Sequence, residues 1–241
     1  MIQVIHRALN ILEYLAQDPQ KEYFLSDISD NLDLNKATCA NIIKTLTDRG
    51  YIEQAEQRKG YKLGHMAYRL TKSTFSNSVD FTAAKVHINN LRDIINENVI
   101  LSVISNGKRI LIHEAETEHE LAVKTSYEQS PYRASTGRVI LAYYDSRQLD
   151  KFIAKNGLPS EDEWAGINSK ADIIKKLDEI RQSSCYIHVN RRHVASATVP
   201  IFSKNKIIAS LGVYLPDIRF TERHKDKIVE ELLKTAKMLQ H

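Results

Sequence analysis

The chain has 241 residues, of which 42% are hydrophobic and 27% charged, a balance typical of a folded globular protein. The formal net charge of +4 is too weak by itself to indicate a nucleic acid partner. Two cysteines exclude a disulfide framework, and no apolar run approaches the roughly 20 residues of a membrane helix. The N-terminal segment carries His6, Arg7 and Glu13 among its apolar residues, which argues against a signal peptide. We therefore expect a cytoplasmic protein.

Residues 1–64 are predicted to form three short helices and a small ribbon. Ser26 is expected to begin the second helix, and Asn35 caps a third helix that Gly50 ends. The segments YIEQ and GYKLG predict two strands joined through AEQRK. The buried stripe of the first helix follows from helical spacing and comprises Ala8, Ile11, Leu12, Leu15 and Ala16.

The pattern changes after residue 64. HMAYRLTKSTFSNSV predicts a linker helix over 65–79, and the remainder, 80–241, is expected to be a second domain. Its predicted elements are a helix over 80–96, strands VILSVIS, RILIHEA and ELAVKTS, helices over 136–144, 147–156 and 169–183, a hairpin VASATVPIFSKNKIIASLGVYLP, and a final helix capped by Thr221. Strands followed by helices without regular alternation predict an α+β fold with an antiparallel sheet.

A helix, a tight turn and a helix followed at once by a ribbon are typical of a winged helix-turn-helix. The third helix would turn its outward face to a groove lined by phosphates, where a carboxylate would be repelled, and that face carries no acid. The candidate DNA contacts are Ser26, Lys36, Ala37, Thr38, Asn41, Lys44, Thr45, Arg58, Lys59 and Tyr61. The alternative is a protein-interaction module with a solvated lysine face.

Several stretches resemble the IclR-type transcriptional regulators. The N-terminal ones are RALNILEYLA, LSDISDNLDLNKAT, TLTDRGYIE and YKLG, and SPYRASTGRVILAYY, LPSEDEW, LDEIRQSSCYI, ATVPIFS and LGVYLPDIRFT continue the match in the same order. The resemblance implies a DNA-binding regulator with a C-terminal GAF-like effector domain, assembled as dimers or dimers of dimers. The chain departs from the family at two places. Asn35 and Ala37 stand where members often have Pro and Ser, and Ala40 and Asn41 stand where they commonly have Arg or His. These changes put an inherited operator sequence in doubt.

The final hairpin offers two different faces by strand alternation. On the first strand, Ala195, Ala197, Val199 and Ile201 form an apolar face. The opposite face of the hairpin carries small and hydroxyl-bearing residues, among them Ser196, Thr198, Ser210, Gly212 and Tyr214. Such a surface suits a small-molecule pocket, although a solvated sheet face is the alternative. The resemblance adds Ser135, Thr136 and Gly137 as ligand contacts. The full set of candidate effector contacts is Ser135, Thr136, Gly137, Asn190, Arg192, Ser196, Thr198, Ser210, Gly212 and Tyr214.

The segment HVNRRHVAS places Arg191, Arg192 and His193 together just before this hairpin. Clustered arginine suits an anionic partner such as a carboxylate, and a basic surface loop is the alternative. Motifs for catalysis or metal binding are missing: His-Glu-x-x-His, Cys-x-x-Cys, Gly-x-Ser-x-Gly and the P-loop do not occur. We therefore expect no catalytic residues, metal or cofactor.

The sequence thus predicts a DNA-binding transcriptional regulator, with repression preferred, whose DNA affinity responds to a small metabolite, for which an anion is one option. The runner-up is a small-acid enzyme with an N-terminal assembly module. The expected partners are an operator duplex, a small-molecule effector and further copies of the chain, and no membrane. Dimer contacts are expected from Leu9 and Leu12 of the first helix and from the connector residues Met66, Tyr68, Leu70 and Phe75.

Overall fold

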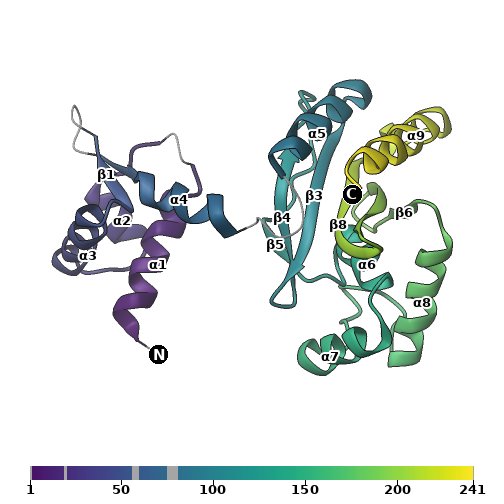
Figure 1. Cartoon of the computed structure of the whole chain (residues 1–241), viewed down its shortest axis with the longest axis horizontal. Helices are drawn as coiled ribbons and strands as arrows, with labels where there is room; N and C mark the ends of the chain where they lie inside the picture. The colour runs from purple at the N-terminus through teal and green to yellow at the C-terminus, as the bar shows by residue number, and fades with distance from the viewer. Residues whose placement is uncertain (1, 19–20, 56–59, 75–80, 241) are drawn as a thin grey trace. The chain divides into compact units, whose positions relative to one another are not determined.

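The computed structural model describes residues 2–18, 21–55, 60–74 and 81–240 of the chain (Figure 1). They belong to two compact units, Met1–Asn77 and Ser78–His241. The predicted α+β class is confirmed, with helices and a small ribbon in the first unit and a helix-flanked antiparallel sheet in the second. Within the described ranges, no helix is both long and apolar enough to cross a membrane.

The N-terminal unit has the predicted winged helix-turn-helix order. Its elements are α1 (Gln3–Leu15), α2 (Leu25–Asn31), α3 (Lys36–Asp48), β1 (Ile52–Gln54), β2 (Tyr61–Leu63) and α4 (His65–Thr74). Strands β1 and β2 pair antiparallel, with Ile52 opposite Leu63. Ile11 of α1, Ile28 of α2 and Ile43 of α3 are buried in one core, which holds the three helices together.

Local signals explain both ends of α3. The Asn35 side chain accepts a hydrogen bond of 2.9 Å from the backbone N–H of Ala37, as expected of an N-cap. Gly50 ends the helix at a φ of +72°, in the left-handed region that favours glycine. A Cβ on Gly50 would also lie 2.6 Å from a ring carbon of His65, the first residue of α4. The end of α3 and the beginning of α4 are therefore in close contact.

Two details of the predicted helices are wrong. Helix α2 begins at Leu25 rather than Ser26, because Phe24 is the N-cap and its backbone N–H donates to Asp27 Oδ2 at 3.2 Å. Ala16 is exposed rather than buried, because α1 ends at Leu15. The linker helix is seen as α4 to Thr74, and residues 75–79 of that prediction lie outside the described residues.

The C-terminal unit contains a single antiparallel sheet of six strands in the order β5-β4-β3-β8-β7-β6. The strands are β3 (Asn98–Ser105), β4 (Lys108–Ala115), β5 (Glu128–Gln129), β6 (Tyr186–Val189), β7 (Val194–Ser203) and β8 (Lys206–Pro216). The helices are α5 (Phe81–Ile95), α6 (Ser135–Ala142), α7 (Ser146–Asn156), α8 (Lys170–Gln182), η1 (Asp217–Arg219) and α9 (Glu222–Met238).

The two faces of this sheet are covered by different helices, as Figure 1 shows for the C-terminal unit. One side, here called the α9 face, packs apolar residues such as Val199 and Leu211 against α5 and α9. The opposite side, here called the α6 face, carries Ser196, Thr198 and Gly212 and contacts α6. Thr198 pairs with Gly212 and Val199 with Leu211, so the predicted division of the hairpin into two faces is confirmed.

The predicted strand over residues 120–126 is wrong. Side chains, rather than a strand ladder, bond this segment: Asn98 Nδ2 donates to the Val123 carbonyl at 2.8 Å and Arg219 Nη1 to the Leu121 carbonyl at 2.9 Å. Backbone pairing with β4 begins only where the Leu111 N–H donates to the Tyr127 carbonyl at 2.9 Å. The strand that follows, β5, has two residues. Alternating polarity alone could not reveal this competition.

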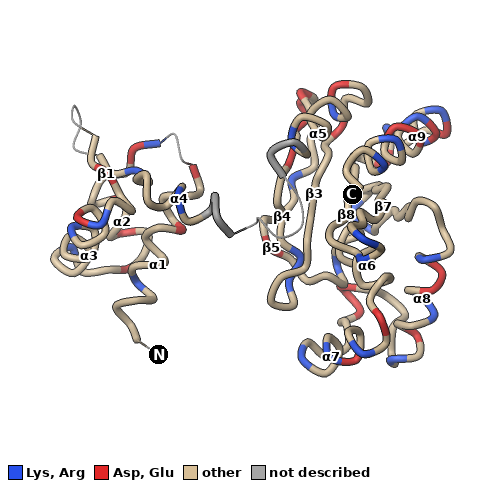
Figure 2. Tube along the Cα trace, viewed as in Figure 1, with Lys and Arg blue, Asp and Glu red and all other residues tan. Residues whose placement is uncertain are grey.

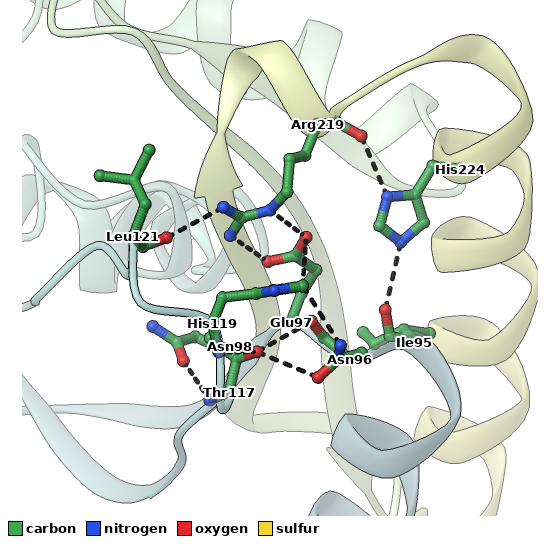
Figure 3. A network of polar contacts seen from close by, with 9 residues as sticks. All are labelled: Ile95, Asn96, Glu97, Asn98, Thr117, His119, Leu121, Arg219 and His224. Carbon is green, nitrogen blue, oxygen red and sulfur yellow. Dashed lines mark hydrogen bonds and ion pairs between the residues drawn. The ribbon is translucent and has the colours of Figure 1, made fainter.

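A buried ion pair fixes the turn between α5 and β3 (Figure 3). Glu97 is 0% exposed, and its two carboxylate oxygens accept from Arg219 Nε and Nη2 at 2.6 and 2.7 Å. The pair holds the pKa of Arg219 above its ordinary value, mainly through the hydrogen bond to Glu97. His224 contacts the carbonyl oxygens of Arg219 and Ile95 through its two ring nitrogens. The network joins α5, η1 and α9.

Arg219→Met should lower the free energy of unfolding of the C-terminal unit by about 3 kcal/mol, because it leaves the Glu97 carboxylate buried without its partner. Glu97→Gln should cost less, since the Arg219 side chain is 22% exposed and can reach solvent. The double variant should recover part of the loss. Urea unfolding followed by the fluorescence of the single tryptophan, Trp164, measures all three. Equal losses in the two single variants would contradict this account.

Candidate functional site

The exposed side of α3 is the candidate DNA surface. Lys36, Ala37, Asn41, Lys44 and Thr45 are exposed, whereas Thr38 is half-buried. The opposite side is buried and contains Cys39, Ile42 and Ile43. Asp48, the last residue of α3, is the one acidic residue in this helix. Figure 2 colours the basic and acidic residues along the chain. A phosphate backbone could therefore approach the first three turns of α3 without meeting a carboxylate of that helix.

Hydrogen bonds limit what some of these residues can offer to DNA. The Thr45 hydroxyl donates to the Asn41 carbonyl at 2.9 Å, which occupies its proton within the helix. The Asn41 side chain is exposed at the centre of the surface. Its amide has the donor and acceptor that an adenine edge requires.

The other predicted contacts lie beside α3 or outside the described residues. Ser26 is exposed in the first turn of α2. Tyr61 is half-buried and exchanges two backbone hydrogen bonds with Tyr23, at 2.8 and 3.0 Å, so it also holds the ribbon against the core. Arg58 and Lys59, at the tip of the predicted wing, lie outside the described residues.

A second candidate site lies in the C-terminal unit, between the α6 face of the sheet and the segments that cover it. It is a cavity of about 850 Å³ that extends from Arg109 on β4 to Tyr186 on β6. Eight of the ten predicted effector contacts line it: Ser135, Thr136, Asn190, Arg192, Ser196, Thr198, Gly212 and Tyr214. The volume suits a small organic molecule.

The remaining two predicted contacts, Gly137 and Ser210, hold α6 against its neighbours instead. The Ser210 hydroxyl donates to the Thr136 carbonyl at 2.9 Å. A Cβ on Gly137 would lie 2.4 Å from the Pro131 carbonyl oxygen, so a larger residue would push α6 away. Neither residue is part of the cavity lining.

Hydroxyl groups form part of the cavity wall. Ser135 and Ser196 are hydrogen-bonded to each other at 2.7 Å, and Ser196 also donates to the His188 carbonyl at 3.1 Å. Thr136 and Thr198 are 3% and 1% exposed, and neither hydroxyl has a hydrogen-bond partner. Both pack closely against Gly212, which has no room for a side chain: a Cβ there would be 2.9 Å from Thr136 Cγ2 and 3.2 Å from Thr198 Oγ1.

Arg109 is a cavity residue that the sequence analysis missed. It is 1% exposed, and its Nη2 donates to Thr125 Oγ1 and Gln129 Oε1, both at 3.0 Å. Nε and Nη1 have no hydrogen-bond partner, and no carboxylate in the described parts of the chain forms an ion pair with the guanidinium. Burial lowers the pKa of Arg109 below its ordinary value, while Glu114 partly opposes that shift. A guanidinium nevertheless stays charged in proteins.

The rim of the cavity is polar and partly paired. Arg191 lies 3.5 Å from Glu161, and Arg133 donates to Asp162 at 2.6 Å. Deeper in, Arg138 donates to the carbonyls of Tyr132 and Glu163 and to the Tyr186 hydroxyl, and its guanidinium lies 4.5 Å from the Trp164 ring centroid. Arg138 thus holds the cavity wall together, whereas Arg109 has unused donors.

Ionisable groups around the cavity carry shifted pKa values. Burial, with a smaller effect of Glu116, raises the pKa of Glu114 to about 6. The Glu114 carboxylate accepts from the Tyr214 hydroxyl. Burial, followed by the charge of Arg138, lowers the pKa of His188. Burial also raises the pKa of the Cys185 thiol to about 11, which keeps this cysteine protonated and unreactive.

A metal site has no support in the part of the chain that the structure describes, because no three His, Cys, Asp or Glu side chains there are grouped to hold an ion. The arrangement instead offers one helix whose first three turns expose no acid, for DNA, and one partly open cavity with polar and apolar walls, for a small molecule.

Comparisons with known proteins agree with this division. Residues 74–241 match the family described as "Bacterial transcriptional regulator IclR C-terminal", and residues 4–56 match the "IclR helix-turn-helix domain". The HTH-type transcriptional regulator KdgR of Dickeya chrysanthemi is 21% identical over 98% of this chain and 78% of its own length. The HTH-type transcriptional repressor AllR of Escherichia coli K12 is 22% identical over 91% of this chain and 82% of its own length.

Solved structures of low sequence identity share the fold. An IclR transcriptional regulator from Alicyclobacillus acidocaldarius superposes with a TM-score of 0.73 at 19% identity, covering 99% of this chain and 98% of that one. An IclR homolog from Microbacterium hydrocarbonoxydans, complexed with 4-hydroxybenzoate, gives 0.72 at 18% identity, covering 98% and 97%. The family comprises transcriptional regulators rather than enzymes, and its C-terminal domain alone spans more than half of the sequence. The chain belongs to the IclR family of DNA-binding transcriptional regulators.

Proposed function

We propose that this regulator represses transcription from an operator and that a small metabolite in the cavity changes its operator affinity. The observation that carries the proposal is the exposed face of α3, which carries no acid before Asp48, in a member of a DNA-binding family. In this proposal residues 1–64 read DNA, residues 65–79 connect the domains and residues 80–241 bind the effector. The protein would work in the cytoplasm, where a bacterial operator lies.

The DNA-binding face divides into one base reader and several phosphate contacts. Asn41 is the base reader, because its exposed amide can bond the donor and acceptor of an adenine in the major groove. Lys36 and Lys44 contact phosphates, as does Ser26 at the beginning of α2.

Asn41→Ala should weaken binding to the preferred operator by about 1–3 kcal/mol and relax the preference at one base pair. Lys44→Ala should instead weaken binding to all duplexes about equally and reduce the salt dependence. Fluorescence anisotropy on duplexes selected from a random pool by the full chain measures both effects. Lys237→Ala, an exposed lysine of α9, is the matched control. An Asn41→Ala variant with unchanged affinity and base preference would refute the assignment.

The effector part of the proposal rests on linkage between two binding sites. A ligand changes operator affinity only if it prefers one of two arrangements of the protein, and the effect is reciprocal. The cavity of about 850 Å³ with its hydroxyl-bearing wall supports a small-molecule site. Two relatives add support: AllR is named a repressor, and the homolog from M. hydrocarbonoxydans was solved with 4-hydroxybenzoate.

Ser196→Leu should fill the cavity and abolish the change in operator affinity that an effector produces, because the side chain lies in the cavity wall. Basal operator affinity should remain within about twofold, since the two sites belong to separate units. Quenching of Trp164 fluorescence identifies an effector from a metabolite panel, and anisotropy then measures the response. Ser184→Leu is the control, because Ser184 is exposed and lies outside the cavity lining. Thr221→Leu would not serve, because Thr221 caps α9. A Ser196→Leu protein that still responds fully would argue against this cavity.

We also propose that two chains act together through α1 and α4. Ile2, Ile5 and Leu9 lie on one side of α1, facing away from buried Ile11 and Leu15, and they are 67%, 53% and 50% exposed. Tyr68 and Leu70 of α4 add further exposed apolar surface, Leu12 and Met66 are half-buried, and Phe75 lies outside the described residues. A second copy would bury this surface and supply the second recognition helix that a specific half-site arrangement requires.

Leu9→Lys should raise the dissociation constant of the dimer at least about tenfold, because it places a charge in an apolar contact. Sedimentation velocity of the intact protein at micromolar concentration measures the effect. Gln3→Lys is the control, since Gln3 is exposed on a different side of α1. A wild-type protein that sediments as a monomer and binds half-sites without cooperativity would rule the dimer out.

A further inference from the structure

Arg109 carries a positive charge that the folded protein itself leaves unbalanced. Its side chain is 1% exposed, yet the described residues supply only the neutral acceptors Thr125 and Gln129, both to Nη2. The N–H on Nε and both N–H groups on Nη1 remain without an acceptor. A buried, unpaired charge is costly, so its retention inside a cavity is informative.

Other charged residues around the cavity do not share this property. Arg138 is also buried, but all three of its nitrogens donate to oxygen atoms of Tyr132, Tyr186 and Glu163. Arg191 is exposed and lies 3.5 Å from Glu161. Glu114 acts on Arg109 from a distance, and its carboxylate is bonded to the Tyr214 hydroxyl. The unused donors of Arg109 therefore mark one end of the cavity.

The neighbouring wall adds a second set of unused groups. The Thr136 and Thr198 hydroxyls are buried and lack hydrogen-bond partners, and both residues lie directly against the backbone of Gly212. Both residues line the same cavity as Arg109. Three polar side chains from α6, β7 and β4 thus line one cavity and have unfilled hydrogen-bonding capacity.

We propose that the cavity binds a small organic acid, with its carboxylate against Arg109 and a hydroxyl or oxo group against Thr136 and Thr198. This inference rests on the proposed function, since the acid would be the effector. The carboxylate would accept from Nε or Nη1 and balance the guanidinium charge, which makes the bond charge-assisted. A neutral molecule of the same shape would leave the charge unbalanced. Arg109 is then the specificity-determining residue.

Variants of the full chain separate a ligand-binding arginine from a structural one. Arg109→Met should leave the thermal midpoint of the ligand-free protein unchanged or raise it, because it removes an unbalanced buried charge. Arg138→Met is the matched control and should lower the midpoint, because it removes bonds to three groups. Trp164 fluorescence reports the transition, since this single tryptophan lines the cavity. Far-ultraviolet circular dichroism verifies that each variant is folded.

Ligand probes then test the chemistry directly. Sodium acetate and sodium gluconate at tens of millimolar should raise the wild-type midpoint by a few degrees above equal concentrations of sodium chloride. Gluconate should exceed acetate, and glucitol, its neutral counterpart, should have no effect. Both acids should lose their effect in Arg109→Met. In Gly212→Ala, which keeps Arg109 but presses a Cβ against Thr136 and Thr198 and displaces them, gluconate should lose its advantage over acetate.

Several outcomes would overturn the inference. They are a wild-type midpoint that neither acid shifts beyond sodium chloride, an equal shift in wild type and Arg109→Met, and a larger shift with sodium phosphate than with either carboxylate. The proposed function fails separately: acids that bind through Arg109 without changing operator affinity would uphold the site and refute the regulation. An effector that changes operator affinity equally in the wild type and in Arg109→Met would uphold the regulation and refute the site.

Discussion

Helices cover both faces of the six-stranded sheet, so polar side chains on its α6 face must find their hydrogen bonds inside the protein. Some of them do: Ser210 bonds the Thr136 carbonyl, and Ser196 bonds Ser135. Thr136 and Thr198 do not, although both are buried. The cavity lies where α6 and the sheet leave these groups unsatisfied, on a face of the kind that antiparallel sheets more often expose to water.

The sequence predicted best what depends on neighbouring residues. Asn35 as an N-cap, Gly50 as a helix end and the two faces of the β7–β8 hairpin follow from local geometry, and all three are observed. The strand expected over 120–126 failed because distant side chains, Asn98 and Arg219, bond its carbonyl groups. Such tertiary competition leaves no trace in the periodicity of the segment itself. The roles assigned to the DNA-facing residues remain predictions.

Arg109 shows why the cavity could be predicted only in part. Strict alternation along β4 would place Arg109 on the side of His113, whose ring contacts Asn89 of α5 on the α9 face. The pairing between β3 and β4 instead shifts at Leu101 and Ser102, an irregularity that puts Arg109 on the α6 face with Glu114. The basic segment at Arg191 and Arg192 drew attention to an anion, yet it lies at the exposed rim. A single shift in register thus places Arg109 on the α6 face, where it is buried.

The position of β3 has a consequence for synthesis of the chain. β3 lies between β4, which follows it directly, and β8, where Asn98 pairs with Tyr214 near the end of the sequence. The N-terminal unit is a compact unit of the first 77 residues and can fold as soon as it leaves the ribosome, whereas the sheet must wait for almost the entire chain. A product that ends before β8 would therefore keep α3 but form neither the complete sheet nor the cavity, and under the proposed function it would bind DNA without responding to an effector.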